Sequence, residues 1–364
     1  MVVISSCNRD EVITTSLPPK IIVEGNGLYR LRLGEEISIA PKYENSDNAT
    51  YSWEIEGVEV CTLATYDFTA SSVGITKIAL TITTSSGSDS VLFTITTIDR
   101  FKVYEYIPAP GQFIGELKTG GFSGSEHTAS DAIAYAERRL TENGFVSLGA
   151  FGGYIVVGFD RVVKNNSGYD FAIGNNAFNT SSEPGVVWVM QDENEDGIPN
   201  DTWYELSGSE TDNNGTIHDY AVTYYRPTAP KMDVSWSDNR GGSGVVEYLE
   251  NFHNQEYYYP QWIDEDSYTL TGTCLQPKSY DSSDNGSMWI NPPFGWGYAD
   301  NDSMEDNINH ENLFDISNAR MANGDIAPLE HIDFIKVQSA IQQQCGWIGE
   351  VSTEVTSFRI VDNE

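Results

Sequence analysis

Basic residues are scarce in this sequence. Lys and Arg together number 20 against 54 Asp and Glu, which gives the 364 residues a formal net charge of −34 at pH 7. Nucleic-acid-binding faces are built from Lys and Arg that contact phosphates, and anionic lipid attracts the same side chains. The deficit therefore argues against a protein that binds nucleic acid or that adsorbs to a membrane through its charge.

The sequence also lacks long apolar runs and any recognisable pattern of cysteine spacing. No segment approaches the ~18 consecutive apolar residues of a membrane-spanning helix. The four cysteines have spacings that fit neither a zinc site nor a disulfide framework, although Cys274 and Cys345 could pair if the fold brought them together. Aromatic residues, at 12%, are too abundant for a disordered acidic tail. These features predict an acidic globular protein.

Recognisable catalytic motifs are missing as well. The sequence contains no complete G-x-S-x-G, P-loop, H-E-x-x-H or G-x-G-x-x-G pattern, and its five histidines are scattered. A glycosidase needs two carboxylates that flank one bond, but among 54 acids no pair stands out. The candidates for such a pair are the acids near the aromatic residues described below, namely Glu256, Asp264 and Asp266. We therefore expect a protein that is not an enzyme.

The chain begins with a segment typical of a lipoprotein. Ile4-Ser5-Ser6-Cys7 resembles the lipobox that signal peptidase cuts before a cysteine, which is then acylated. Charged residues after this cysteine are common in surface-exposed lipoproteins of the Bacteroidetes. We expect residues 1–19 to be a signal remnant and a flexible tether, with Cys7 as the lipidated residue. A free cysteine in a frayed tail is the alternative.

Residues 20–99 are predicted to form a first domain of short antiparallel strands. Apolar side chains occupy every second position in 51–55, 78–82 and 91–95, as a half-buried sheet requires. This pattern predicts a β-sandwich of immunoglobulin size. The segment around Trp53 resembles the central strand of a PKD-like domain, in which the Trp fills the core of the sandwich. The resemblance implies a spacer module without chemistry.

Residues 100–364 are predicted to form a larger, jelly-roll-like β-sandwich with one helix and long loops, so that the whole chain is mainly β. The helix is expected over residues 131–140, with Ser130 as its N-cap and Gly144 as its left-handed C-terminal residue. The segments between the other predicted strands are rich in Asn, Asp, Gly and Pro. Such loops commonly carry function on a rigid frame, so we expect the ligand-binding site here.

One acidic loop of this second domain matches the first half of a calcium-binding loop. Oxygen-bearing side chains stand at positions 1, 3 and 5 and a glycine at position 6, but position 12 is Trp203 rather than the usual Glu. The loop predicts a structural calcium ion, and the alternative is an acidic turn. The expected ligands are Asp192, Asn194, Asp196, the Ile198 carbonyl and Asp201.

Aromatic residues are concentrated between positions 252 and 298, many of them beside Pro and Gly. Rings on such loops form rigid contact surfaces at low entropic cost, so the cluster predicts a ligand-binding surface. The alternative is that these rings fill the core of a loop-rich sandwich. The candidate ligand-binding residues are Phe252, His253, Tyr257, Tyr258, Tyr259, Trp262, Trp289, Asn291, Phe294, Trp296 and Tyr298.

Several segments of the second domain, among them 169–173, 183–189, 203–206 and 346–350, resemble a family of Bacteroidetes cell-surface lipoproteins. Members with a PKD-like domain are similar to proteins from cobalamin-uptake loci that bind the vitamin and support a TonB-dependent outer-membrane transporter. The resemblance implies a lipid-anchored outer-membrane protein with cobalamin as its ligand, not as a cofactor. A surface glycan-binding lipoprotein is the alternative, and a glycan hydrolase is a third hypothesis.

Overall fold

The computed structural model describes residues 17–361 apart from 24, 254 and 284. The chain divides into two compact units, Met1–Ile98 and Asp99–Glu364. Strands and loops make up nearly all of both units, and α1 (Ala129–Thr141) is the one α-helix of the described residues. None of the helical segments in these residues is long and apolar enough to cross a membrane. The predicted mainly β fold is confirmed.

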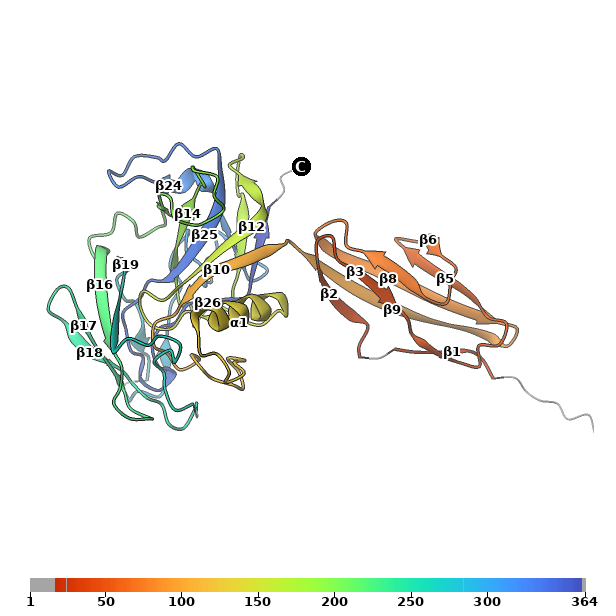
Figure 1. Ribbon diagram of the computed structural model, residues 1–364, viewed down its shortest axis with the longest axis horizontal. Coiled ribbons are helices and arrows are strands. Elements are labelled where there is room, and N and C mark those ends of the chain that lie inside the picture. Colours follow the sequence, from red (N-terminus) through yellow and green to blue (C-terminus); the bar gives the residue numbers. More distant parts are fainter. Residues whose placement is uncertain (1–16, 24, 254, 284, 362–364) are drawn as a thin grey trace, which may run out of the picture. The chain divides into compact units, whose positions relative to one another are not determined.

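The first unit is a β-sandwich built from one five-stranded sheet and two strand pairs. The sheet has the order β2-β9-β8-β5-β6, while β3 pairs with β7 and β1 with β4; the long β8 and β9 dominate this unit in Figure 1. The strands are β1 (Lys20–Ile22), β2 (Leu28–Arg32), β3 (Glu36–Ile39), β4 (Lys42–Glu44), β5 (Thr50–Ile55), β6 (Val58–Cys61), β7 (Tyr66–Thr69), β8 (Gly74–Thr84) and β9 (Gly87–Ile98).

Trp53 lies at the centre of this sandwich, as predicted. Its side chain is fully buried, its ring stacks on Phe93 with 5.7 Å between centroids, and its Nε1 donates to the Leu63 carbonyl at 2.9 Å. The alternation at period two therefore directs one row of side chains from β5, β8 and β9 into a single core.

The Trp53→Ala variant should lose about 3–5 kcal/mol of stability in the first unit, because a large buried side chain is replaced by a cavity. Thermal unfolding followed by calorimetry would measure this loss. Leu92→Ala is the matched control: Leu92 lies on the same strand as Phe93 but is 54% exposed, so we expect a change below about 0.5 kcal/mol. Equal effects of the two variants would contradict this assignment of the core.

The second unit contains one six-stranded and two four-stranded sheets. Their orders are β10-β12-β25-β14-β15-β24, β22-β23-β13-β27 and β18-β17-β16-β19, and two short pairs, β11-β26 and β20-β21, complete the unit. The strands are β10 (Phe101–Ile107), β11 (Val146–Ser147), β12 (Tyr154–Lys164), β13 (Phe171–Gly174), β14 (Gly185–Met190), β15 (Tyr204–Leu206), β16 (Ile217–Tyr225), β17 (Val234–Asp238), β18 (Ser243–Val246), β19 (Ser267–Cys274), β20 (Tyr280–Asp281), β21 (Trp289–Ile290), β22 (Asn307–Ile308), β23 (Glu311–Phe314), β24 (Ala319–Arg320), β25 (His331–Ser339), β26 (Glu354–Val355) and β27 (Ser357–Ile360). The unit also has two 3-10 turns: η1 (Ile316–Asn318) follows β23, and η2 (Gly346–Ile348) precedes β26.

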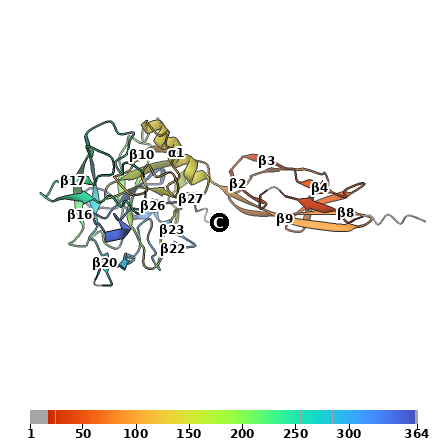
Figure 2. The ribbon, with the colours of Figure 1, turned by 90° about the horizontal axis from the view of Figure 1, so that it is seen from below.

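The helix α1 packs beside β10, where Figures 1 and 2 both place it. Its N-cap is Thr128, not Ser130 as predicted, because the Thr128 side chain accepts a hydrogen bond from the Asp131 amide and the Asp131 carboxylate accepts one from the Thr128 amide. This reciprocal capping box satisfies more amide groups than a lone serine would. At the other end Asn143, rather than the predicted Gly144, takes the left-handed conformation, with φ 63°.

The three cysteines in the described part of the chain, Cys61, Cys274 and Cys345, are free thiols. Cys274 and Cys345, the pair that the sequence left open, are both buried and do not form a disulfide. Burial raises the pKa of each of these two thiols to about 11, which leaves both as uncharged core residues.

Candidate functional site

Most of the predicted aromatic binding residues lie in the interior of the second unit. Tyr258 and Tyr259 are fully buried in a hydrophobic cluster with Tyr224, whereas Phe294 and Tyr298 belong to a separate cluster around Val186. The hydroxyl groups of both tyrosines form hydrogen bonds with the backbone of the same unit. The Tyr258 hydroxyl accepts from the Leu249 amide at 3.1 Å, and the Tyr259 hydroxyl donates to the Glu265 carbonyl at 2.8 Å. These rings fill two cores.

Trp262 is also an interior residue, with 8% of its surface exposed. Its ring stacks on Tyr106 at 6.1 Å and on Phe122 at 5.7 Å, and Phe122 stacks in turn on Tyr135 of α1 at 3.6 Å. The long loop therefore delivers Trp262 into the layer that joins the helix to β10. Such packing is structural and presents no ring face to a ligand.

The remaining predicted residues are scattered. Phe252 is 54% exposed and lies beside Trp347, at 5.9 Å between ring centroids. His253 is half-buried with its ring edge on Phe113 at 4.7 Å, and burial lowers the pKa of its imidazole. Tyr257 and Trp289 are half-buried, and Asn291 is buried. The described residues thus do not assemble the single aromatic surface that was predicted, because the rings are distributed among separate cores and edges.

Replacing Trp262 by Ala should lower the stability of the second unit by about 3–5 kcal/mol. The reason is that the stack linking α1 to β10 loses its central ring. Chemical denaturation of the full chain would measure the change, and the exposed Phe252→Ala serves as the control, with a small expected effect. A Trp262→Ala protein as stable as the parent would show that the ring is not needed for packing.

One cavity of about 380 Å³ does contain a predicted residue, Trp296. Its walls combine the rings of Trp296 and Tyr169 with three acids, Glu305, Asp306 and Asp315. Leu313 and Phe314 at the end of β23 and Leu206 at the end of β15 supply apolar lining. No Lys, Arg or His is among the described residues that line this cavity. We refer to it as the Trp296 pocket.

Close packing of glycines fixes the Trp296 loop. Gly297 has φ 93°, and a Cβ at this position would lie 2.6 Å from the Gly208 Cα, so only glycine fits. The Gly297 amide donates to Asp306 Oδ2 at 2.6 Å, and the Ser209 amide donates to the Trp296 carbonyl at 2.9 Å. The backbone on both sides of Trp296 is therefore held, which orients the indole at the pocket.

Asp306 is the buried acid of the pocket, with 1% of its surface exposed. Burial raises the pKa of its carboxyl, and the Gly297 amide opposes this rise. The second oxygen, Oδ1, accepts no hydrogen bond of normal geometry, although Ser303 and Asn312 lie near enough to lower the pKa. A buried acceptor whose neighbours reach it only with poor geometry costs free energy, and a ligand hydroxyl or amine could reduce that cost.

The other acids stand at the rim. Tyr169 is 38% exposed and its hydroxyl donates to the Glu305 carbonyl at 3.4 Å; burial, with Asp306 and Glu305 nearby, raises the pKa of its phenol. Asp315 caps η1 by accepting from the Ser317 amide at 2.8 Å. The pocket therefore offers two aromatic rings and several oxygen acceptors in fixed positions.

Sequence reasoning missed every wall of this pocket except Trp296. Tyr169 and Asp306 are 137 positions apart (306 − 169), and they meet because β13, which follows Tyr169, pairs with β23, which follows Asp306. The only signal in the sequence was composition, since aromatic and acidic residues are frequent throughout the second unit. Pairing between distant strands, and not a local motif, builds the site.

A second aromatic group surrounds Lys336 on β25. The Lys336 Nζ lies 4.9 Å from the Trp188 ring centroid and 5.5 Å from those of Tyr154 and Trp203. Burial lowers the pKa of this lysine to about 8, against the opposing effect of Glu105 and Glu205. Because the ring faces already hold an ammonium group from the protein itself, this group is less open to a ligand than the Trp296 pocket.

The predicted calcium loop is exposed, and its side chains bind its own backbone. Asp192 accepts from the Asp196 and Gly197 amides at 3.2 and 2.8 Å, and Asp201 accepts from the Glu193 amide at 2.9 Å. Asn194 Oδ1 accepts from the Asp196 amide at 2.9 Å, while Ile198 is exposed. The loop carboxylates are not among those that the described structure gathers within 4.8 Å of one another. Calcium binding here stays a prediction.

Comparison with known proteins identifies the first unit. Residues 18–84 match the PKD-like domain family, so this unit carries an immunoglobulin-like sandwich of the PKD kind, as the segment around Trp53 predicted. No curated protein matches the sequence.

Several solved structures match the chain at low sequence identity and low TM-score. The tandem Ig repeats of Dlar are 15% identical over 22% of this chain and 47% of theirs, with a TM-score of 0.19. A SusE-like protein is 7% identical over 95% and 98%, and a carbohydrate-binding module of the β-sandwich superfamily is 12% identical over 95% and 99%, both with a TM-score of 0.22. The chain thus spans less than half of the first structure. Because these scores lie far below 0.5, the function has to be inferred from the residues of the chain itself.

Proposed function

We propose that the second unit binds a glycan, without chemistry, and that the Trp296 pocket holds one of its sugar rings. The observation that carries this proposal is the combination, in one cavity of about 380 Å³, of two aromatic rings with the buried Asp306. This combination suits a sugar, because a pyranose has an apolar face of C–H groups and a rim of hydroxyl donors.

Each wall of the pocket suits one part of such a ring. The indole of Trp296 and the phenol of Tyr169 can cover C–H faces, which contributes apolar contact with little loss of side-chain entropy. Carboxyl oxygens accept hydrogen bonds, so Glu305, Asp306 and Asp315 can pair with the hydroxyl donors of a sugar. With no basic residue in the described lining and a net charge of −34, acidic sugars are disfavoured.

Cobalamin, the ligand implied by the whole-chain resemblance, fits this pocket less well. Ligand pockets span roughly 300–1,000 Å³, and this cavity lies near the lower end of that range. A corrin macrocycle is much broader than a sugar ring and would extend far outside the pocket. Cobalamin is therefore the alternative ligand, and it would need a wider surface than the aromatic residues of the 252–298 segment provide, since five of these rings are buried and the others are scattered.

Replacing Trp296 by Ala should weaken glycan binding by tenfold to thirtyfold or more, because a ring that anchors a ligand commonly contributes about 2 kcal/mol. Isothermal titration of the full chain with a panel of soluble neutral glycans, and with cyanocobalamin, would measure this effect. Tyr169→Ala is a second variant whose more exposed ring makes a folding defect less of a concern.

The matched control for that titration is Trp347→Ala, since Trp347 is 47% exposed and does not line the pocket. Binding unaffected by Trp296→Ala and Tyr169→Ala would refute the pocket as the glycan site. An isotherm with the corrinoid and none with any glycan would instead favour the cobalamin alternative.

We further propose that this binding unit is held at the cell surface by a lipid on Cys7, where it could pass ligand to a TonB-dependent transporter. Cys7 lies outside the described residues, so the proposal is supported only by the lipobox resemblance. Expression with a complete signal sequence, followed by fatty-acid labelling, should give a labelled protein in the outer-membrane fraction. Cys7→Ala should lose both the label and the membrane fraction, and a variant that keeps them would exclude this anchor.

A further inference from the structure

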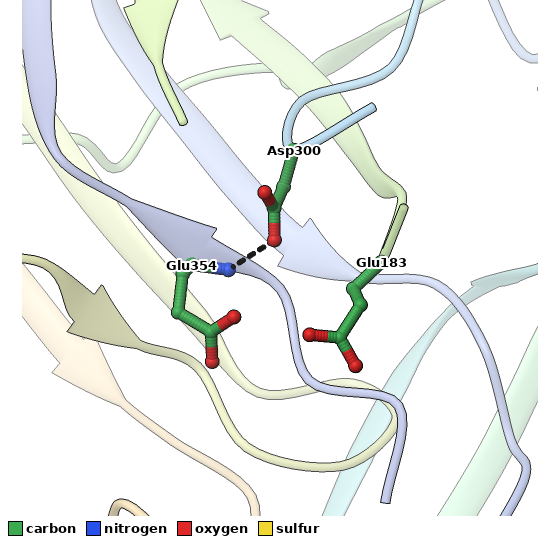
Figure 3. A group of neighbouring side chains, drawn as sticks. All are labelled: Glu183, Asp300 and Glu354. Carbon is green, nitrogen blue, oxygen red and sulfur yellow. Dashed lines mark hydrogen bonds between the residues drawn. The ribbon is translucent and has the colours of Figure 1, made fainter. Parts of the chain in front are cut away.

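Three carboxyl groups meet inside the second unit, away from the Trp296 pocket. Glu183 precedes β14, Asp300 follows the buried Ala299, and Glu354 belongs to β26. One carboxylate oxygen from each lies within 4.8 Å of those of the other two. Figure 3 shows all three side chains directed toward a common space, with Asp300 above the facing carboxylates of Glu183 and Glu354. We call this group the carboxylate cluster.

The backbone holds the carboxylate cluster in place. The Glu354 amide donates to Asp300 Oδ2 at 2.8 Å, and the Glu183 amide donates to the Asp300 carbonyl at 2.9 Å. Ser352 donates two hydrogen bonds to the cluster. Its amide donates to Glu183 Oε1 at 3.3 Å, and its hydroxyl donates to Glu354 Oε1 at 3.0 Å. Loops that are distant in sequence are therefore tied together around these acids, so the cluster is a built feature of the fold.

The charges of the cluster are not balanced by the protein. Asp300 and Glu354 are 1% and 2% exposed, and no ion pair in the described part of the chain involves either of them or Glu183. Burial raises the pKa of all three carboxyls, that of Glu354 to about 7, and for Glu183 and Asp300 the neighbouring acids add to the rise. Buried carboxylates need a cation, protons or a basic partner.

Protons alone leave part of the cluster unsatisfied. A proton shared between Glu183 and Glu354, whose carboxyl groups are near enough to hydrogen-bond, would remove one repulsion. Asp300 Oδ1, however, accepts no hydrogen bond of normal geometry, although the Asn176 and Ala177 amides lie near enough to lower its pKa. The Asp300 carboxyl group as a whole faces the shared space in Figure 3, so a cation bound there could interact with this incompletely satisfied side chain.

We infer that the carboxylate cluster binds one divalent cation, and that this cation is calcium. Calcium takes six to eight oxygen ligands at about 2.3–2.6 Å, so two ligands on opposite sides of the ion lie up to about 5 Å apart. One oxygen from each of the three carboxyl groups lies within 4.8 Å of the others, so all three could reach one such ion. All three ligands are carboxylates, which favours a hard cation over zinc. Glu183 is the least buried of the three residues.

The carboxylate cluster is a different calcium site from the 192–201 loop, which the sequence predicts. In the 192–201 loop the carboxylates are exposed or only half-buried, and Asp192, Asp196 and Asp201 already accept hydrogen bonds from neighbouring amides. In the carboxylate cluster Asp300 and Glu354 are buried, and one Asp300 oxygen accepts no hydrogen bond of normal geometry. A cation contributes more in the second environment, because charges interact more strongly where water is excluded.

Calcium binding by the full chain, after treatment with a chelator, tests the inference. Direct titration and ion counting after dialysis should give at least one bound calcium per chain, and calcium should raise the melting temperature of the second unit by roughly 5 °C or more at a hundredfold excess over Kd. Asp300→Asn and Glu183→Gln, which keep the size of each side chain, should weaken binding by at least tenfold and remove most of that rise.

Asp196→Asn in the acidic loop is the matched control and should leave the calcium-dependent rise intact. A parent protein that binds no calcium would overturn the inference, as would a response lost in Asp196→Asn but kept in Asp300→Asn. If Asp300→Asn does not fold, the calcium affinity and the calcium-dependent rise in melting temperature of Glu183→Gln test the inference instead. Glycan binding is not used as a readout here, so this outcome is independent of that of the proposed function.

Discussion

The packing of loop aromatics onto short strands is the constraint on which the second unit depends. Several of its strands have only two to four residues and cannot enclose a core by themselves. Tyr258, Tyr259 and Trp262 therefore fold inward from one long loop, and Phe294 and Tyr298 from another. The rings that remain for a ligand are those that these cores do not use, chiefly Trp296 and Tyr169 at the pocket.

Acidic charge is the second property that organises the unit. A net charge of −34 is tolerable on a solvated surface, where water and salt screen it, but inside the protein each carboxylate needs a specific partner. Backbone amides serve that purpose for Asp306 on one oxygen and for the exposed loop acids. In the carboxylate cluster the amides are too few for three acids, and this shortage distinguishes it from the many acids elsewhere.

Local pattern and non-local pairing explain what the sequence could and could not predict. Alternation at period two is a property of each strand alone, so the core around Trp53 and the mainly β class could be predicted. The apolar face of α1 predicts a helix from local spacing alone. Its N-cap, however, is Thr128 and lies two residues before the predicted Ser130, because Thr128 and Asp131 form a capping box. The pocket and the carboxylate cluster are formed by strand pairing over more than a hundred residues, which no local spacing encodes.

One segment connects the two sites. Trp296 and Asp306 line the pocket, while Asp300 between them belongs to the carboxylate cluster. The next residue, Asn301, is fully buried and bonds to the Phe294 amide at 2.8 Å and to the Gly295 carbonyl at 2.8 Å, so a shift at position 300 would reach the Trp296 loop. A cation that fixes Asp300 would therefore order this segment before a ligand arrives. Ordering in advance reduces the entropic cost of binding, and the coupling is reciprocal: a ligand in the pocket would strengthen cation binding by the same factor.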